Sequence, residues 1–390
     1  MIKDHDIRRV AQFGRALRSG RRGRKFESCH ADPINKGFDN IGTLIFFLKG
    51  TGLHYILFHM KNFTKLLIWI LTGILVFVLG VRLYFRLPVH SYYSSSEKGF
   101  LIPDSDNGFI AQGLAYSEPD DCFLVTGYMK DHSASPIYVI DKATGKMSKK
   151  ILLLSEDGSD YCGHCGGLTV HGDLVYVAGS EDHCIYVYSY EDILKGSSGN
   201  VRCLGSIPVC EDINVAFVES TEDAIYAGEF YKDPEYPTPE SHKIMTAAGD
   251  LNQALMVGYH FSDDDNALFS VDPVPFAAYS LTDLVQGLTF KDNRAYVSTS
   301  WGTGFSNIYV YDLSKANAGS IKISDRDVPL YELDSAALER TVMFPPMSEQ
   351  IVFADDKLYT MCESASDKYI FGKFTSARWC YATDISRDMP

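Results

Sequence analysis

The chain has 390 residues, 46% of them hydrophobic, so it is long enough to bury one large core or two ordinary ones. Its net charge of −14 is unevenly divided: residues 1–86 carry 15 Lys or Arg against 5 Asp or Glu, and residues 87–390 carry 21 against 45, a net of −24. The acidic part should repel nucleic acid, because such binding requires Lys and Arg to neutralise phosphates. We therefore exclude nucleic acid as a partner of residues 87–390.

Residues 1–59 show no pattern typical of a folded domain. Within them, residues 8–33 mix Arg, Gly and Ser without periodicity and resemble the translation of a tRNA gene, in which case Met60 is the true start. We interpret residues 1–59 as a disordered or artefactual extension. The alternative interpretation of the basic run is a patch for nucleic acid or anionic lipid.

An uncharged apolar run occupies residues 66–81, with two lysines shortly before it and Arg82 and Arg86 after it. With the apolar residues 83–85 added, its length approaches the roughly 20 residues with which a helix crosses about 30 Å of hydrocarbon. No small-residue cleavage site follows, so we predict a single-pass signal-anchor helix over residues 60–86, not a cleaved signal or a buried core helix. The basic N-terminal flank predicts that the part after residue 86 lies outside the cytoplasm, at the cell membrane.

Residues 87–98 are predicted to be a short polar tether, and a different pattern begins at residue 99. Short runs rich in Val, Tyr, Ile and Phe alternate with turns rich in Gly, Asp and Asn, and one hairpin recurs five times. The hairpins begin at Gln112, Gly166, Asn214, Gln286 and Glu349. Third strands are predicted at residues 137–141, 185–188, 254–259 and 308–312, and fourth strands at residues 149–154, 203–208, 276–280 and 328–332.

A unit of four antiparallel strands that repeats around an axis is the blade of a β-propeller. We therefore predict an all-β fold, a β-propeller over residues 99–390, in which each blade buries its apolar faces against its neighbours. Five blades are predicted; six is the alternative, if the insertion at residues 231–253 holds another blade. Residues 99–103 stand where a fourth strand precedes every other hairpin, and they should complete the last blade and close the ring.

With these hairpins, residues 99–390 resemble the six-bladed and quinoprotein-like bacterial propellers, and among them a set of exported propellers from anaerobic Gram-positive bacteria. The resemblance rests on fold motifs, since the Trp-Asp and kelch signatures are absent. Gluconolactonase-type propellers hold a central divalent metal with a carboxylate and amides. Only loosely similar residues occur here, so the resemblance does not imply that activity.

The innermost strand of each propeller blade lines the axial channel, so the residues at its entrance should converge on one place. By repeat position these are Gln112, Gly166 with His164 ahead of it, Asn214, Gln286 and Glu349, joined by Glu181, Glu229, Trp301 and Glu363 where the adjacent strands end. Amides, carboxylates and an aromatic ring suit a sugar or a hydrated divalent cation. The predicted ligand-binding residues are Gln112, Asn214, Gln286 and Trp301. Glu349 and Asn214 are the predicted ligands of a Ca²⁺ ion, and the alternative is the polar lining of a water-filled channel.

Cys162 and Cys165 enclose Gly-His, which gives the motif of protein disulfide isomerases. That chemistry requires a reactive thiolate at the start of a helix, whereas two glycines and a strand pattern follow here. We interpret the motif as the glycine-rich start of the second blade, not as a redox or zinc site. Eight of the nine cysteines follow residue 86, so structural disulfides are compatible with the sequence, but the spacing does not define their pairing.

The predicted function is that of a membrane-anchored binding module for a glycan or protein ligand. The alternative is a metal-dependent hydrolase or lyase acting on a lactone or carbohydrate. Its candidate ligands or bases are Glu229, Glu349 and Glu363, with His164 as acid or base. Serine-hydrolase and nucleotide chemistry are disfavoured, because the sequence holds no nucleophile elbow, P-loop or dinucleotide motif.

Overall fold

The computed structural model describes residues 40–180, 182–210 and 213–386, and side chains from residue 59 onward. The chain divides into two compact units, residues 1–72 and 73–390. Helix α1 (Asn40–Arg86) begins in the first unit and ends in the second. The tRNA-like stretch at residues 8–33 lies outside the described residues, so its interpretation stays a prediction.

Within α1, the segment His59–Arg86 is long and apolar enough to cross a membrane, with a mean hydropathy of 2.5. None of its most apolar stretch is buried, and the Trp69 side chain is 75% exposed. Each Å² of apolar surface left in water costs about 25 cal/mol, so a helix with apolar side chains on all sides is suited to lipid. The predicted apolar helix is therefore present, and its use as an anchor is taken up below.

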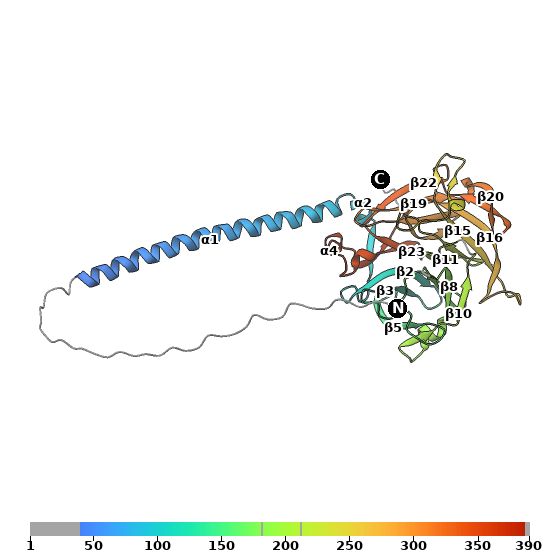
Figure 1. Ribbon diagram of the computed structural model, residues 1–390, viewed down its shortest axis with the longest axis horizontal. Coiled ribbons are helices and arrows are strands. Elements are labelled where there is room, and N and C mark those ends of the chain that lie inside the picture. The colour runs from blue at the N-terminus through green and yellow to red at the C-terminus, as the bar shows by residue number, and fades with distance from the viewer. Residues whose placement is uncertain (1–39, 181, 211–212, 387–390) are drawn as a thin grey trace, which may run out of the picture. The chain divides into compact units, whose positions relative to one another are not determined.

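The second unit contains a five-bladed β-propeller (Figure 1). The first blade consists of β2 (Phe109–Ser117), β3 (Cys122–Met129), β4 (Pro136–Asp141) and β5 (Lys146–Leu154). The second consists of β6 (Cys165–His171), β7 (Leu174–Gly179), β8 (Cys184–Ser189) and β10 (Gly205–Pro208). The third consists of β11 (Phe217–Ser220), β12 (Ala224–Gly228), β15 (Ala254–Phe261) and β16 (Val271–Leu281).

The fourth blade consists of β17 (Val285–Lys291), β18 (Arg294–Thr299), β19 (Ser306–Asp312) and β22 (Leu338–Phe344). The fifth consists of β23 (Ser348–Ala354), β24 (Lys357–Cys362), β25 (Trp379–Thr383) and β1 (Ser96–Leu101). The innermost strands β2, β6, β11, β17 and β23 contact one another in that order, and β23 contacts β2. The ring is therefore closed, and β1 closes it by pairing antiparallel with β25, as predicted for residues 99–103.

Shorter helices, turns and strands lie outside the four-stranded blades. These are β9 (Asn200–Arg202), β13 (Ile244–Met245), β14 (Leu251–Asn252), β20 (Asn317–Ile323), β21 (Arg326–Glu332), the helices α2 (His90–Ser94), α3 (Tyr190–Lys195) and α4 (Gly372–Thr375), and the 3₁₀ turns η1 (Glu240–His242), η2 (Leu313–Lys315) and η3 (Glu363–Ala365). The insertion at residues 231–253 thus holds only η1 and a two-residue hairpin. Six blades are excluded, because the only sheet that the insertion forms is the two-stranded pair of β13 and β14, not a four-stranded blade.

Strand β7 shows why the sequence of each hairpin is almost continuously apolar. Val175 and Val177 pack against the first blade, whereas Tyr176 and Ala178, which point to the opposite face, pack against the third. Successive side chains of a strand point to opposite faces, and both faces of a blade are covered by its neighbours. One hydrophobic cluster of this kind lies between each pair of adjacent blades.

The predicted fourth strand of the fourth blade, residues 328–332, was wrong. These residues belong to β21, which pairs in parallel with β16 of the third blade, and β22 takes the predicted place beside β19. A tight turn at Ser324 and Asp325, both with positive φ, folds β20 and β21 into a hairpin. Val328 and Leu330 are buried in the cluster between the second and third blades, which explains why β21 prefers that sheet.

Residues 87–98, predicted as a polar tether, contain α2 and the start of β1. Val89 and Tyr92 are buried in the cluster between the fourth and fifth blades, and the Tyr92 hydroxyl lies 2.7 Å from the Thr360 hydroxyl. The segment therefore packs on the propeller over part of its length.

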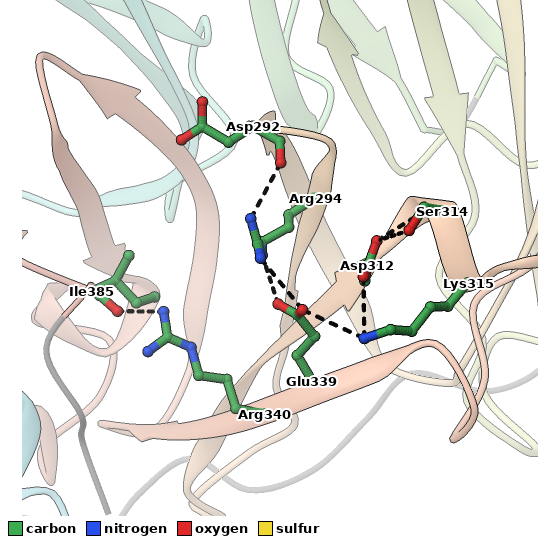
Figure 2. A network of polar contacts seen from close by, with 8 residues as sticks. All are labelled: Asp292, Arg294, Asp312, Ser314, Lys315, Glu339, Arg340 and Ile385. Carbon is green, nitrogen blue, oxygen red and sulfur yellow. Dashed lines mark hydrogen bonds and ion pairs between the residues drawn. The ribbon is translucent and has the colours of Figure 1, made fainter.

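Ion pairs join the outer strands of the fourth blade, as Figure 2 shows. Arg294 on β18 donates to Glu339 on β22 over 2.6 Å, and Lys315 lies 3.1 Å from Asp312 on β19 and 3.7 Å from Glu339. All four side chains are partly exposed to solvent, which screens their charges, so each pair contributes little to the stability of the blade. Most of the stability of this blade therefore comes from its buried faces.

Candidate functional site

A cavity of about 590 Å³ lies where the innermost strands begin. All five blades contribute to its wall, through Gln112, Gly166, Ala216, Gln286 and Met347. Of the residues predicted to converge, those that line the cavity are Gln112, His164, Gly166, Asn214, Gln286, Trp301 and Glu363. Glu229 and Glu349 are not part of its lining, and Glu181 lies outside the described residues.

The strands bring these side chains together through bulges. The pairing register of β2 with β3 shifts between Ala111 and Gly113, which leaves Gln112 as an extra residue, and β17 shifts in the same way at Gln286. A bulge redirects the side chain of the extra residue. In the third blade, Ala216 has the repeat position of Gln112, and Asn214 reaches the cavity from two residues earlier.

One wall of the cavity is aromatic. The ring of Trp301 lies 5.9 Å from that of Phe230 and 6.1 Å from that of Tyr236, measured between centroids. Trp301 is 42% exposed, and the Lys232 ammonium lies 5.4 Å from its ring. Phe230 and Tyr236 flank the start of the insertion, outside the repeat, so the hairpin pattern held no signal for them. A partly exposed aromatic cluster inside a cavity offers a flat apolar surface to a ligand.

Another part of the wall is polar and centres on Glu363. Its carboxylate accepts hydrogen bonds from the hydroxyl of Tyr369 over 2.7 Å and from that of Tyr128 over 3.2 Å. The Lys368 ammonium donates to the Tyr128 hydroxyl over 2.7 Å. Burial raises the pKa of Glu363, although the Tyr369 hydrogen bond and the Lys368 charge oppose the shift. A carboxyl of raised pKa on a cavity wall can donate a proton as well as accept one.

His164 packs against the ring of Tyr128, with 3.9 Å between the ring centroids. Burial lowers the pKa of His164 to about 4, and the charges of Lys368 and His132 add to this shift. Its imidazole is therefore neutral at physiological pH. A neutral imidazole on the cavity wall can hydrogen-bond a hydroxyl group or accept a proton.

Glu349 is almost completely buried, and neither oxygen of its carboxyl has a hydrogen-bond partner within the described chain. Burial raises its pKa well above the usual range, and the negative charge of Glu363 raises it further. Leaving a buried polar group unpaired costs roughly 1–3 kcal/mol. Glu349 is therefore a source of instability. Its predicted partnership with Asn214 at a Ca²⁺ ion stays a prediction, and among the described residues no three His, Cys, Asp or Glu side chains form a metal-binding group.

Glu229, another candidate from the sequence, has hydrogen-bond partners for both of its carboxylate oxygens. Each of its carboxylate oxygens lies 3.0 Å from Nδ1 of His242, and the backbone N–H groups of Leu255 and Asn214 donate to it over 2.9 and 3.3 Å. These bonds fasten the insertion to the third blade beside the cavity. In this conformation Glu229 serves as a positioning residue for Asn214 and the insertion.

At the axis lies the fully buried side chain of Gln350, which was not among the site residues predicted from the sequence. Its Oε1 accepts from the backbone N–H groups of Leu114 and Leu168, each over 2.9 Å. Its Nε2 donates to the carbonyls of Leu168 and Val218 over 3.0 and 2.8 Å. One side chain on the fifth blade thus joins the first three blades at the axis.

Gln350 fits because three of the other four innermost strands have glycine at its repeat position: Gly113, Gly167 and Gly287. A Cβ on Gly287 would lie 2.9 Å from the Cα of Gln350. Glu219 completes the axial contacts: it accepts from Thr289 of the fourth blade over 2.8 Å, and its burial raises its pKa to about 8. The sequence did contain a signal for Gln350: it is a glutamine at a repeat position where three of the other four blades carry glycine.

The Cys-Gly-His-Cys motif lies at the start of β6, as the strand interpretation predicted. Cys162 is exposed and Cys165 is fully buried, and burial raises the pKa of Cys165 to about 12. Both Cys162 and Cys165 have free thiols. A buried thiol of high pKa makes a poor nucleophile, so the geometry does not favour disulfide exchange.

The fold and the cavity together define a five-bladed β-propeller with a ligand-sized cavity at one end of its channel. No protein-family model and no curated protein matches the chain. Its structure is similar to the PQQ-bound aldose sugar dehydrogenase of Streptomyces coelicolor, with 13% identity, coverage of 73% of this chain and 95% of that one, and a TM-score of 0.39.

Two further solved structures are similar in fold. A luciferin-regenerating enzyme has 13% identity, coverage of 74% and 94%, and a TM-score of 0.38. The glutaminyl cyclase of Myxococcus xanthus has 7% identity, coverage of 74% and 93%, and a TM-score of 0.37. Values this low do not inform the chemistry of the site. The resemblance to an exported bacterial set stays a prediction.

Proposed function

We propose that this chain is a membrane-anchored binding module outside the cytoplasm whose cavity takes a carbohydrate. The observation that carries the proposal is the pairing of an aromatic wall, formed by Phe230, Tyr236 and Trp301, with amide and phenol groups in one cavity. A sugar ring has a flat apolar face and a hydrogen-bonding edge, and each has a counterpart here. A volume of about 590 Å³ falls within the usual range for small-ligand sites.

The anchor part of the proposal is supported by the helix His59–Arg86. Its apolar side chains are exposed on all sides, and basic residues dominate the chain before it. The positive-inside rule then places the acidic propeller on the outer side of the membrane.

The Trp301→Ala variant should lose at least tenfold in affinity for a saccharide, equal to about 1.4 kcal/mol, because it removes the exposed aromatic platform. The measurement is isothermal titration of the full chain in detergent with glucose, N-acetylglucosamine and their short oligomers. Leu268→Ala is the matched control, since Leu268 is 43% exposed and lies outside the cavity lining. Saccharide binding that persists unchanged in Trp301→Ala would contradict the proposal.

The alternative function, hydrolysis or elimination on a lactone or carbohydrate, has one supporting observation: Glu363 faces the cavity with a raised pKa. If it acts as the acid or base, Glu363→Gln should reduce turnover of an aldonolactone at least a hundredfold, the usual lower range for general acid–base catalysis. Tyr369→Phe removes one hydrogen bond to Glu363 but keeps the carboxyl, and should have a smaller effect. No turnover by the unaltered chain, with or without Ca²⁺, would exclude this alternative.

A further inference from the structure

The loop between β24 and β25 connects the cavity with the end of the apolar helix. We call its residues 367–376 the rim. Lys368 and Tyr369 of the rim line the cavity. Two residues further on, Phe371 stacks on Phe85 in the last turn of α1, with 5.8 Å between ring centroids.

The last turn of α1 is held against the propeller by several contacts. Phe85 is almost fully buried, and its ring lies 6.4 Å from that of Phe305 in the fourth blade. The Arg86 guanidinium donates to the Ser376 hydroxyl and lies 3.9 Å above the ring of Tyr93. The rim therefore lies at the level of residues 85 and 86, where the apolar segment ends.

This level corresponds to the headgroup region when the helix spans a bilayer. A membrane consists of about 30 Å of hydrocarbon within a total of about 40–45 Å, which leaves a polar layer only several ångströms thick on each side. A loop in contact with the final residues of the span cannot lie far beyond that layer. Tyrosine is enriched in this layer, and Tyr84, whose side chain is 63% exposed, lies at this level.

The rim has the composition of a surface that contacts lipid. Ile370 is 78% exposed, more than any other large apolar side chain of the described residues. It lies between Lys368 and Lys373, both exposed, and the only acidic residue of the rim is Asp367. The rim is thus basic within a part of the chain whose net charge is −24. Exposed lysines beside an apolar side chain match anionic headgroups over hydrocarbon.

From these contacts we propose that the rim rests on the bilayer, with Ile370 inserted among the lipids and Lys373 on anionic headgroups. The proposal rests on the anchor part of the proposed function and goes beyond it, because it assigns a second lipid contact, made by the propeller itself. The cavity wall formed by Lys368 and Tyr369 then lies directly beside the membrane.

The test uses the full chain in nanodiscs of POPC and POPG, with Ile370→p-benzoylphenylalanine as a photocrosslinker. Illumination should give a phospholipid adduct detectable by mass spectrometry, because the ketone would lie among acyl chains. The matched control is Leu268→p-benzoylphenylalanine, an exposed apolar site on a loop of the third blade, which should give none. Absence of a lipid adduct at position 370, or an adduct with a second copy of the chain, would overturn the proposal.

A second comparison tests whether the positive charge of Lys373 contributes to the lipid contact. Lys373→Glu should reduce the adduct yield at position 370 about fivefold in POPG-containing discs and leave it unchanged in pure POPC, whereas Lys322→Glu, on β20, should do neither. A high-salt wash of membranes that carry the chain tests the anchor separately. Release from the pellet would overturn both anchor and rim, while retention without a lipid adduct would overturn the rim alone. No saccharide is used, so neither result depends on the carbohydrate proposal.

Discussion

Replacing Gln350 by alanine should lower the free energy of unfolding by roughly 3–5 kcal/mol, the largest loss that we expect from a single substitution at the axis. The variant leaves the backbone N–H groups of Leu114 and Leu168 without partners in a site that water does not reach. Each buried group that loses its hydrogen bond costs about 1–3 kcal/mol, and the missing side chain leaves a cavity. The melting temperature of the full chain in detergent should fall by about 5–15 °C.

Gln286→Ala is the matched control. Gln286 is also a glutamine near the axis, but it lines the cavity, and within the described residues the only hydrogen bonds of its side chain are donations to Ser300 over 3.3 and 3.5 Å. Its loss should cost less than about 1 kcal/mol. Equal losses for the two variants would mean that the amide of Gln350 does not join the blades. Gly287→Ala should resemble Gln350→Ala in direction, since its new methyl group would press on the backbone of Gln350.

Most of the fold could be predicted because a propeller imposes a strict demand on each strand. A run such as Val175 to Gly179 is buried on both faces, so nearly all of its residues are apolar and have a high β-strand propensity. Turn residues at both ends of such a run mark where the strand begins and ends. The neighbour of an outer strand was harder to predict. Alternating apolar residues in β21 show that one face is buried, but they do not specify which blade buries it.

The site was only partly predictable for a related reason. Repeat position led to Gln112 and Gln286, because a register shift recurs at this place in the first, second, fourth and fifth blades. Lys368, Tyr236 and Phe230 come from segments that interrupt or flank the repeat, so no repeated pattern marks them. Glu229 occupies a predicted position but is bonded by His242, thirteen residues away in an insertion that has no counterpart in the other blades.

Replacing Glu349 by glutamine should make the protein more stable, and more so at high pH. In the unfolded chain this carboxyl ionises near its ordinary pKa, whereas burial keeps the folded pKa well above that value. Between these two pKa values the folded state binds a proton that the unfolded state has released, so its stability falls as pH rises, by about 1.4 kcal/mol per pH unit. Glutamine has no proton to release, and the variant lacks this loss.

The melting temperature of Glu349→Gln should therefore exceed that of the unaltered chain by a larger margin at pH 8 than at pH 5. Glu118→Gln, an exposed change on the turn after β2, should produce no such margin. A melting temperature below that of the unaltered chain at pH 8 would contradict the prediction.

Ca²⁺ separates two explanations for an unpaired carboxyl beside the cavity. A ligand that binds only the folded state raises its stability by mass action. If Glu349 is a cation ligand, Ca²⁺ added after EDTA should raise the melting temperature of the unaltered chain and leave that of Glu349→Gln unchanged. If both respond alike, the predicted Ca²⁺ site is excluded at this residue. A stability gain in Glu349→Gln together with weaker saccharide binding would then assign the cost of the buried carboxyl to ligand recognition.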